Sequence, residues 1–290
     1  MNRPQPLTLL DYLTRTTEFF RQRGIENPRL NAERLLCGVL RCARIDLYLL
    51  FDRPLKEEEV SAYREMVRRR GQGEPLQYIL GSTEFYGREF VVTPDAFIPR
   101  PETEVLVEKV LTRLEGTEQP LVADIGTGSG CIGLTIAAER ADAHVIATDI
   151  SEPALALARK NAERLGVAER VEFRAGDLTA PLGLAQVHAL VSNPPYVSFA
   201  DRDALPREVR DYEPEVALFA DEDGLALIAR LIMQAPTAVL PGGFVALEMG
   251  IGQAERVRSL WQTFAPGWSI AVERDLAGAE RIVVATRPAG

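Results

Sequence analysis

The tetrapeptide Asn193-Pro194-Pro195-Tyr196 combines residue types that could hold a planar nitrogen group for chemistry, and it follows an apolar, strand-like run. Proline has a fixed φ and no N–H, so the carbonyl of Pro194 is held rigidly and can accept a hydrogen bond. The side-chain oxygen of Asn193 is a second acceptor, and Tyr196 can pack against a flat group. These features favour a site that aims an amide nitrogen at an electrophile over a plain proline turn after a strand.

A second group of residues predicts a ligand-binding turn. It follows the apolar run 121–125, opens the helix-like run 131–139, and comprises Asp124, Gly126, Thr127, Gly128, Ser129 and Gly130. Glycines let the backbone turn tightly and let a ligand approach the main chain. The alternative interpretation is a tight strand-to-helix turn that binds nothing.

Acidic residues at the ends of the next two predicted strands narrow the choice of ligand. Asp149 is placed to accept hydrogen bonds from ribose hydroxyls, and Asp177 lies where an adenine edge could sit. The Gly-x-Gly-x-x-Gly spacing from Gly128 also fits a dinucleotide. Asp124 at the entrance of the loop would repel a pyrophosphate but would suit an ammonium group. The pattern therefore favours S-adenosylmethionine over a dinucleotide as the cofactor.

Sequence periodicity predicts the elements that position these residues. Residues 8–70 have the pattern of short amphipathic helices, the first capped by Thr8, and predict a helical bundle. Two short β-type runs around Gly87 predict a hairpin. From residue 121 onward, strand-like runs (121–125, 145–149, 171–175, 189–192 and 244–249) alternate with helix-like runs (131–139, 152–165, 225–240 and 253–263), with a Pro-Gly-Gly turn at 241–243. The runs 269–274 and 281–286 have the pattern of a closing antiparallel pair, so the whole predicts an open, mostly parallel α/β sheet. The predicted domains are a helical domain over 1–75, a β-hairpin linker over 76–100 and a catalytic domain over 101–290.

Composition excludes several functional classes. The chain has 290 residues and a net charge of −9, which argues against direct nucleic-acid binding. No apolar run approaches the ~20 residues that span a bilayer. Its three cysteines lack Cys-x-x-Cys spacing, and its two histidines are not part of a ligand cluster. We expect a cytoplasmic monomer without a metal.

Further motifs make the chain resemble one family. Residues 97–104, Phe-Ile-Pro-Arg-Pro-Glu-Thr-Glu, resemble a signature of the peptide chain release factor N5-glutamine methyltransferases, also called HemK or PrmC. Segments 74–81, 85–87, 211–214 and 247–250 are similar to that family as well. The tetrapeptide after the fourth strand is similar to that of methyltransferases acting on nitrogens conjugated to planar systems.

The resemblance implies a class I S-adenosylmethionine-dependent methyltransferase, with a Rossmann-like, seven-stranded, mostly parallel sheet, an N-terminal helical bundle and a connecting β-hairpin. The implied substrate is the glutamine of the Gly-Gly-Gln loop in class 1 release factors, methylated at N5. The helical domain would help to grip the release factor. The donor would contact Asp124, Gly126 to Gly130, Asp149, Ile150, Asp177, Leu178 and Asn193. The glutamine would be held by Asn193, Pro194, Pro195 and Tyr196, with Arg100, Glu102 and Thr103 lining the site.

Three alternatives stay open. A glutamine methyltransferase acting on a ribosomal protein resembles the chain in the tetrapeptide, but its Pro-Arg is followed by Ser-Pro, where this chain has Pro101-Glu102. An adenine N6 nucleic-acid methyltransferase would need a basic groove. A donor-binding module without transfer activity would be expected to have an altered tetrapeptide. The chain also carries Leu178 where family members can carry an aromatic residue, so an adenine there would have apolar contact without stacking.

Overall fold

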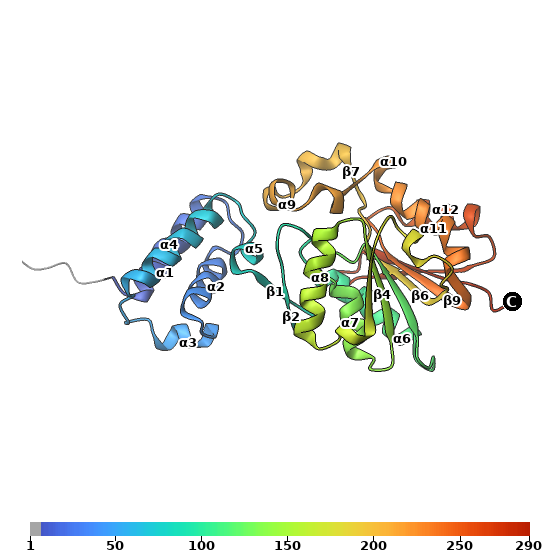
Figure 1. Cartoon of the computed structure of the whole chain (residues 1–290). Helices are drawn as coiled ribbons and strands as arrows, with labels where there is room; N and C mark the ends of the chain where they lie inside the picture. Colours follow the sequence, from blue (N-terminus) through green and yellow to red (C-terminus); the bar gives the residue numbers. More distant parts are fainter. Residues whose placement is uncertain (1–6) are drawn as a thin grey trace, which may run out of the picture. The chain divides into compact units, whose positions relative to one another are not determined.

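The structure is a computed structural model that describes residues 7–290, so residues 1–6 of the predicted helical domain lie outside the described residues. The chain folds into two compact units (Figure 1). The helical unit contains the residues up to Gly81 together with 207–212, and the α/β unit contains residues 82–206 and 213–290. The predicted linker thus divides between the two units, because its hairpin belongs to the α/β unit.

The helical unit is a bundle with a single apolar core. Its helices are α1 (Leu9–Gln22), α2 (Pro28–Leu40), α3 (Arg44–Leu49), α4 (Glu57–Gly71), α5 (Leu76–Leu80) and α9 (Arg207–Tyr212). Thr8 and Asp11 cap α1 reciprocally, since each side chain accepts a hydrogen bond from the backbone N–H of the other residue. Apolar residues at helical spacing fill the core, including Leu9, Leu13, Phe20, Leu35, Leu36 and Tyr63.

Helix α9 belongs to the helical unit although it comes late in the sequence. Buried Arg70 of α4 pairs with Glu208 of α9 at 2.7 Å, and it also donates to Asn31 at 2.8 Å. The hydroxyl of Tyr212 donates to the carbonyl of Gln72 at 3.2 Å. The chain therefore leaves the α/β unit after the tetrapeptide and returns after one short helix.

The α/β unit is built on one seven-stranded sheet of order β10-β11-β9-β6-β3-β4-β5. Its strands are β3 (Leu121–Ile125), β4 (His144–Asp149), β5 (Val171–Ala175), β6 (Val187–Ser192), β9 (Val239–Glu248), β10 (Ser269–Arg274) and β11 (Glu280–Thr286). Strands β5, β4, β3, β6 and β9 run parallel, while β11 is antiparallel to both neighbours. The sheet, the helical bundle and the hairpin of β1 (Ser82–Phe85) with β2 (Arg88–Val91) confirm the predicted fold class.

Alternating residues of the central strands enter two different cores, as the period of a strand requires. Val122 of β3 packs in a core with α6 (Pro101–Arg113) and α7 (Cys131–Glu139), and α8 (Glu152–Leu165) adds Ala162 to this core. The adjacent Ala123 packs on the other face with α11 (Ala226–Ala238) and α12 (Ala254–Phe264). Helices thus cover both faces of the sheet (Figure 1).

Two regions differ from the sequence-based prediction. The strand predicted at 244–249 begins earlier, because β9 runs from Val239 to Glu248 and includes 241–243, where Gly242 has φ of 80° and the pairing of β6 with β9 shifts register. No elements were predicted between β6 and α11. Short elements occupy this stretch in the α/β unit: β7 (Val197–Ser198), β8 (Phe219–Ala220), α10 (Asp221–Gly224) and the 3-10 turns Phe199–Ala204 and Glu215–Ala217.

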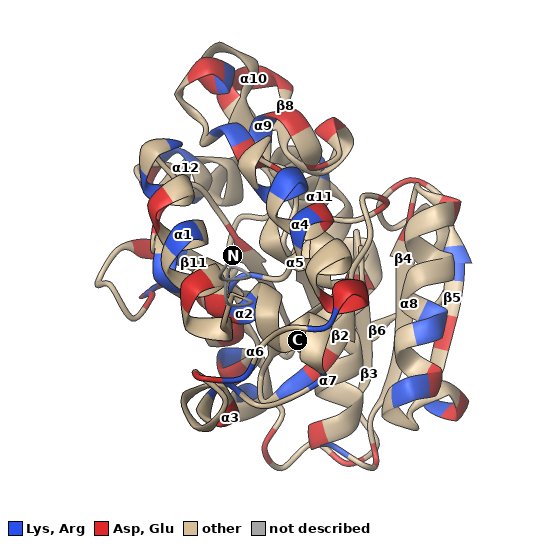
Figure 2. Ribbon diagram, turned by 90° about the vertical axis from the view of Figure 1, so that its left-hand side faces the viewer, with Lys and Arg blue, Asp and Glu red and all other residues tan. Residues whose placement is uncertain are grey.

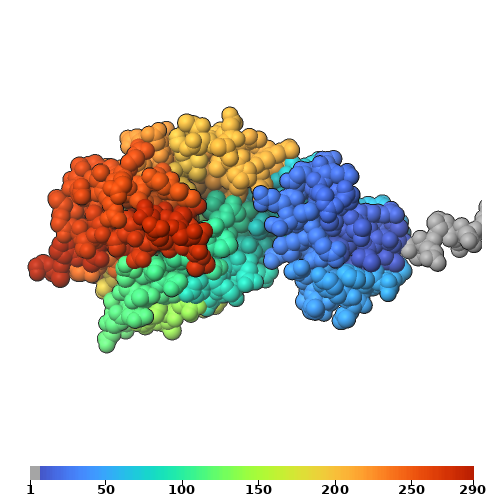
Figure 3. Space-filling view, turned by 180° about the vertical axis from the view of Figure 1, so that it is seen from behind, coloured from blue at the N-terminus to red at the C-terminus, as the bar shows by residue number. Residues whose placement is uncertain are grey.

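The surface of each unit mixes charges of both signs. Basic and acidic segments alternate on α8 and on α4 (Figure 2). On one face of the α/β unit, α6 lies beside the C-terminal strands (Figure 3), where Arg113 pairs with Glu273 at 3.0 Å. Within residues 7–290, no helix has the length and apolar character needed to cross a bilayer.

Candidate functional site

Most of the predicted site residues lie at or just after the carboxyl ends of the parallel strands β3, β4, β5 and β6. Strands β3 and β6 are parallel neighbours, and the chain runs from β3 through β4 and β5 before it returns to the other side of β3. Ligands of such sheets bind at this reversal of strand order, outside the carboxyl ends. Here β3 ends in the glycine turn and β6 ends in the tetrapeptide. The hydroxyl of Ser192 ties the two strand ends together by donating to the carbonyl of Ile125 at 2.6 Å.

Hydrogen bonds to β4 and from α8 hold the glycine turn in place. The N–H of Thr127 donates to the carbonyl of Thr148 on β4 at 2.9 Å. The buried side chain of Asn161 on α8 donates to the carbonyl of Ser129 at 2.9 Å. Gly130 begins α7 with φ of 86°, and a Cβ there would lie 2.6 Å from Leu134, so only glycine fits. The turn therefore presents a rigid backbone to a ligand.

Asp124 lies beneath this turn and is completely buried. Its Oδ2 accepts hydrogen bonds from the Thr127 hydroxyl at 2.6 Å and from the N–H of Gly133 at 2.9 Å. Its Oδ1 is buried and has no hydrogen-bond partner among the described residues. Burial raises the pKa of Asp124 from 3.8 to about 6, against the opposing effect of the two hydrogen bonds. The structure thus buries a carboxyl group that has one oxygen without a partner among residues 7–290.

This burial predicts a pH-dependent cost to stability. Because the folded pKa of Asp124 is about 6 and its ordinary value is 3.8, the folded state retains a proton that the unfolded state loses between these values. The free energy of unfolding should therefore fall as pH rises from 4 to 6. Asp124→Asn keeps an acceptor for Thr127 and Gly133 but does not titrate. We expect its stability relative to the wild type to increase by on the order of 3 kcal/mol between pH 4 and pH 7.

Urea unfolding followed by tryptophan fluorescence measures this difference, because both tryptophans of the chain, Trp261 and Trp268, lie in the α/β unit. Other groups that titrate over the same range cancel when the variant and the wild type are compared at each pH. A difference that stays constant from pH 4 to pH 7 would contradict the buried, ionised carboxylate.

Asp149 lies at the end of β4 and helps to shape the turn. Its Oδ2 accepts from the N–H of Gly128, and its Oδ1 accepts from the N–H of Ser151, both at 2.9 Å. The next side chain, Ile150, is 63% exposed, which leaves an apolar surface beside a carboxylate. Each carboxylate oxygen can accept a further hydrogen bond. The position thus offers acceptors and an apolar contact at one strand end.

Asp177 follows β5 and has a partner that sequence reasoning missed. Arg230 of α11 forms an ion pair with its Oδ2. The next residue, Leu178, has a left-handed backbone with φ of 48°, and its carbonyl accepts from the Thr148 hydroxyl at 3.2 Å. Such a conformation is unfavourable for leucine, so the surrounding contacts must hold it. Residues 177 and 178 therefore form a fixed corner near the ends of β4 and β5.

The tetrapeptide presents two hydrogen-bond acceptors. The Nδ2 of Asn193 donates to the hydroxyl of Thr103 at 3.2 Å. No described residue donates to the Oδ1 of Asn193 or to the carbonyl of Pro194. Both oxygens lie after β6, beside the glycine turn of β3. The amide oxygen of Asn193 and the carbonyl of Pro194 are therefore two neighbouring acceptors directly after β6.

Tyr196 is anchored by residues to which the sequence analysis assigned no role. Its hydroxyl donates to the Oε1 of Glu248 at 3.2 Å and accepts from Arg281 at 3.4 Å. Burial raises the pKa of Tyr196, and a nearby negative charge on Glu248 adds to this effect. The phenol therefore stays neutral. Glu248 could have been noticed in the sequence as the one charged residue near the end of an apolar strand, 244–249.

The residues expected to line the site have different environments. Arg100 forms an ion pair with buried Glu213, which also accepts from the N–H of Ile98 at 3.1 Å. The guanidinium of Arg100 also lies 4.7 Å from the centre of the Phe97 ring. Glu102 is exposed on the first turn of α6, whereas Thr103 is buried. Arg100 is thus paired with Glu213, which lies in the segment 211–214 that is similar to the family.

A turn with left-handed backbone conformation packs against the tetrapeptide. Glu222, Asp223 and Gly224 have φ of 56°, 54° and 82° in succession. A Cβ at Gly224 would lie 2.0 Å from the backbone carbonyl of Tyr196. The Nε2 of Gln253 donates to that same carbonyl at 3.1 Å and to the carbonyl of Asp223 at 3.3 Å. The turn and the tetrapeptide are therefore packed backbone against backbone.

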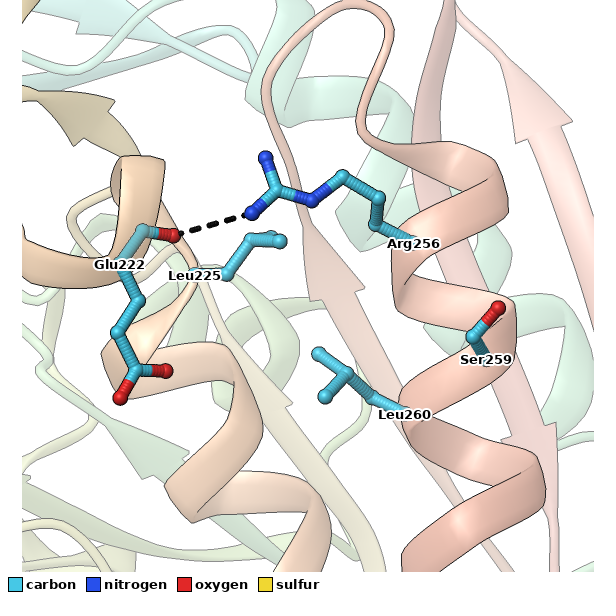
Figure 4. Close-up of a pocket in the computed structure, with 5 residues that line it drawn as sticks. All are labelled: Glu222, Leu225, Arg256, Ser259 and Leu260. Carbon is cyan, nitrogen blue, oxygen red and sulfur yellow. Dashed lines mark hydrogen bonds between the residues drawn. The ribbon is translucent and has the colours of Figure 1, made fainter.

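A surface pocket adjoins this turn (Figure 4), and its lining residues are Glu222, Leu225, Arg256, Ser259 and Leu260. Arg256 of α12 donates to the carbonyl of Glu222 at 3.3 Å across the pocket. Its guanidinium also lies 3.3 Å from the carboxylate of Asp223. The pocket thus belongs to the support of the left-handed turn. Within residues 7–290, no group of His, Cys, Asp and Glu side chains could hold a metal ion.

Comparison with known proteins gives two family matches and close relatives. The family described as PrmC N-terminal domain matches residues 11–81, and the Methyltransferase small domain matches residues 101–207. The release factor glutamine methyltransferase of Nitratidesulfovibrio vulgaris is 45% identical over 267 residues, which cover 91% of this chain and 90% of that protein. The protein of the same name from Geobacter sulfurreducens is 45% identical over 259 residues, covering 89% and 90%.

A solved structure of a methyltransferase from Pyrococcus furiosus has a TM-score of 0.51 and 16% identity, covering 70% of this chain and 91% of that one. This likeness shows a shared fold. The two relatives go further, since their similarity covers about nine-tenths of both sequences at 45% identity. The chain belongs to the family of release factor glutamine methyltransferases.

Proposed function

We propose that this protein transfers a methyl group from S-adenosylmethionine to the N5 side-chain amide of the glutamine in the Gly-Gly-Gln loop of class 1 release factors. The observation that carries the proposal is the pair of available acceptors, the Oδ1 of Asn193 and the carbonyl of Pro194, beside the glycine turn. Family membership supports the same activity. We further propose that the protein acts as a cytoplasmic monomer.

The residues around the glycine turn fit S-adenosylmethionine. Asp124 has a buried oxygen without a partner, which would suit the ammonium group of the donor. Asp149 retains lone pairs for ribose hydroxyls, and exposed Ile150 offers an apolar contact. Asp177 and Leu178 would lie at the adenine. When bound, this donor supplies a methyl group already activated by a sulfonium, so the protein need only bind, orient and exclude water.

The tetrapeptide would orient the glutamine. Its amide nitrogen is a poor nucleophile because the lone pair is delocalised into the carbonyl. Asn193 and Pro194 would each accept one N–H of that amide, which fixes the direction of the nitrogen. Tyr196, held by Glu248, would pack against the amide plane. The nitrogen becomes strongly acidic once methylated, so no general base is assigned among the residues of the chain.

Other parts of the protein would recognise the rest of the release factor. Glu102 is exposed next to buried Thr103 and is available at the entrance to the site. Arg100, which is engaged with Glu213, would shape the wall. We propose that the helical domain over residues 1–75 docks the release factor and that residues 76–100 link it to the catalytic domain over residues 101–290.

Mass spectrometry of substrates incubated with enzyme and labelled S-adenosylmethionine tests the function. The arms are a class 1 release factor, the same factor with its loop glutamine replaced by alanine, a ribosomal-protein mixture, ribosomal RNA and duplex DNA. We expect one added methyl, about 14 mass units, on the loop glutamine of the release factor alone. Label in the ribosomal proteins or the nucleic acids, with none in the release factor, would overturn the proposal in favour of an alternative.

A further inference from the structure

A chain of hydrogen bonds connects the tetrapeptide to two buried residues, Thr103 and Glu248. The Nδ2 of Asn193 donates to the Oγ1 of Thr103 at 3.2 Å, and the Thr103 hydroxyl donates to the Oε2 of Glu248 at 2.7 Å. The hydroxyl of Tyr196 donates to the other carboxylate oxygen of Glu248 at 3.2 Å. Glu248 is only 3% exposed. One buried carboxylate is thus connected to the first and the last residue of the tetrapeptide.

The direction of each hydrogen bond in this chain follows from the number of hydrogens. Burial raises the pKa of Glu248, against the opposing effects of the Thr103 and Tyr196 hydroxyls and of the positive charge of Arg281. In the ionised form, which those three groups favour, the carboxylate can only accept, and a hydroxyl has a single hydrogen to donate. Thr103 gives its hydrogen to Glu248, so it can only accept from Asn193. The NH2 group of Asn193 must therefore face Thr103, and the side-chain oxygen of Asn193 must face away from it.

We propose that Glu248 is a positioning residue that, through Thr103, turns the side-chain oxygen of Asn193 toward the substrate amide. This inference rests on the proposed function, in which that oxygen accepts an N–H of the glutamine. Asn193 reversed by half a turn would present its NH2 group to the substrate. Two N–H groups would then face each other, and the nitrogen of the substrate would lose one of its two acceptors.

Arg281 limits how these hydrogen bonds can rearrange when one carboxylate oxygen of Glu248 is replaced by an NH2 group. In Glu248→Gln, one side-chain oxygen becomes an NH2 group, which must face either Tyr196 or Thr103. The Tyr196 oxygen already accepts from Arg281 at 3.4 Å, so an NH2 group there would leave the phenol hydrogen without an acceptor. The new NH2 group therefore faces Thr103. The Thr103 hydrogen is then free to be donated to the oxygen of Asn193, which reverses the Asn193 amide.

Four variants and a matched control test this inference in the full-length protein. Glu248→Gln reverses the donors and acceptors in the hydrogen bonds that link residue 248, Thr103 and Asn193, with little change of side-chain volume. Thr103→Val removes the hydroxyl, and Thr103→Ser keeps it. The double variant of Thr103→Val with Glu248→Gln tests whether the two residues act along one path. Glu273→Gln is the control, because Glu273 pairs with Arg113 of α6 outside the site.

The readouts are kcat and KM for release-factor methylation and the Kd for S-adenosylmethionine measured by calorimetry. Glu248→Gln and Thr103→Val should each lower kcat by about 10- to 100-fold, since a positioned acceptor is lost. The Kd of the donor should change by less than about threefold, as no donor contact is removed. Thr103→Ser should recover kcat to within about threefold of the wild type. Glu273→Gln should match the wild type.

The double variant should have a kcat within about threefold of that of Thr103→Val, because residues on one path do not have multiplicative effects. Multiplied losses in the double variant would overturn the inference, as would a Glu248→Gln enzyme with the kcat of Glu273→Gln. If Glu248→Gln fails to fold, the comparison of kcat between Thr103→Val and Thr103→Ser is the test. Equal kcat values in these two variants would overturn the inference. A wild-type enzyme that leaves the release factor unmethylated overturns the proposed function and this inference together, whereas an active wild type confines any failure to the inference.

Discussion

Asn193→Ala is expected to lower kcat for methylation of the release factor by about 100-fold or more while the protein still binds S-adenosylmethionine. The substitution removes one of the two oxygens that would orient the glutamine nitrogen, and preorganised hydrogen-bond partners of this kind contribute roughly 10²- to 10³-fold. The Thr103 hydroxyl loses its donor, but the remaining bond to Glu248 stays intact. The loss should therefore affect turnover and leave the fold in place.

Two variants frame this result. Gln186→Ala truncates an exposed amide that donates to the carbonyl of Thr237 at 3.2 Å, and it should retain the kcat of the wild type. Asp149→Ala should instead weaken donor binding, because it removes the carboxylate that accepts from Gly128 in the turn. Single-turnover rates and calorimetric Kd values separate the two effects. Near-normal turnover in Asn193→Ala would remove this residue from the proposed mechanism.

Local sequence signals predicted most of the α/β unit because each element has a strong pattern of its own. Helix α8 runs from Glu152 to Leu165, as predicted, since Ser151 caps its first turn and Gly166 adopts the left-handed conformation after its last. Strand β5, Val171–Ala175, also has its predicted bounds. The turn predicted at 241–243 lies inside β9, where Gly242 has φ of 80° and the pairing of β6 with β9 shifts register.

The region between β6 and α11 could not be predicted, because tertiary contacts specify its structure. Helix α9 has only six residues, too few to be stable alone. The Arg70–Glu208 pair and the Tyr212 hydroxyl hold it against a part of the chain that is more than a hundred residues earlier. The left-handed conformations at Glu222 and Asp223 likewise have no local signal.

The sequence predicted those site residues whose positions follow from the strand order. Parallel strands bring their carboxyl ends to one edge, so Asp124, Asp149 and Asn193 were expected to lie close together. Glu248 and Arg230 were missed because their partners are distant in the sequence. The hydrogen bond from Thr103 to Glu248 joins residues 145 positions apart, and the pair of Arg230 with Asp177 joins residues 53 positions apart.

Gly224→Ala is expected to have the second large effect, by pushing the left-handed turn away from the tetrapeptide. The added Cβ would lie 2.0 Å from the carbonyl of Tyr196, a contact with backbone that no side-chain rotation can relieve. Overpacking and the positive φ together should lower the free energy of unfolding by about 3 kcal/mol. The displaced Tyr196 carbonyl would also lose its hydrogen bond from Gln253, so kcat should fall by about tenfold or more.

Gly278→Ala provides a control with the same φ. Gly278 also has φ of 82°, but a Cβ there would have no atom within 4 Å. This variant should therefore lose only the roughly 1 kcal/mol that a left-handed alanine costs, with unchanged kcat. Urea unfolding followed by tryptophan fluorescence gives both free energies, because both glycines lie in the α/β unit. Equal losses of stability in the two variants would mean that the turn yields without cost, and an unchanged kcat in Gly224→Ala would mean that Tyr196 does not depend on it. If Gly224→Ala loses more stability and more kcat than Gly278→Ala, the contact between the turn and the tetrapeptide accounts for the difference, because φ is 82° at both glycines.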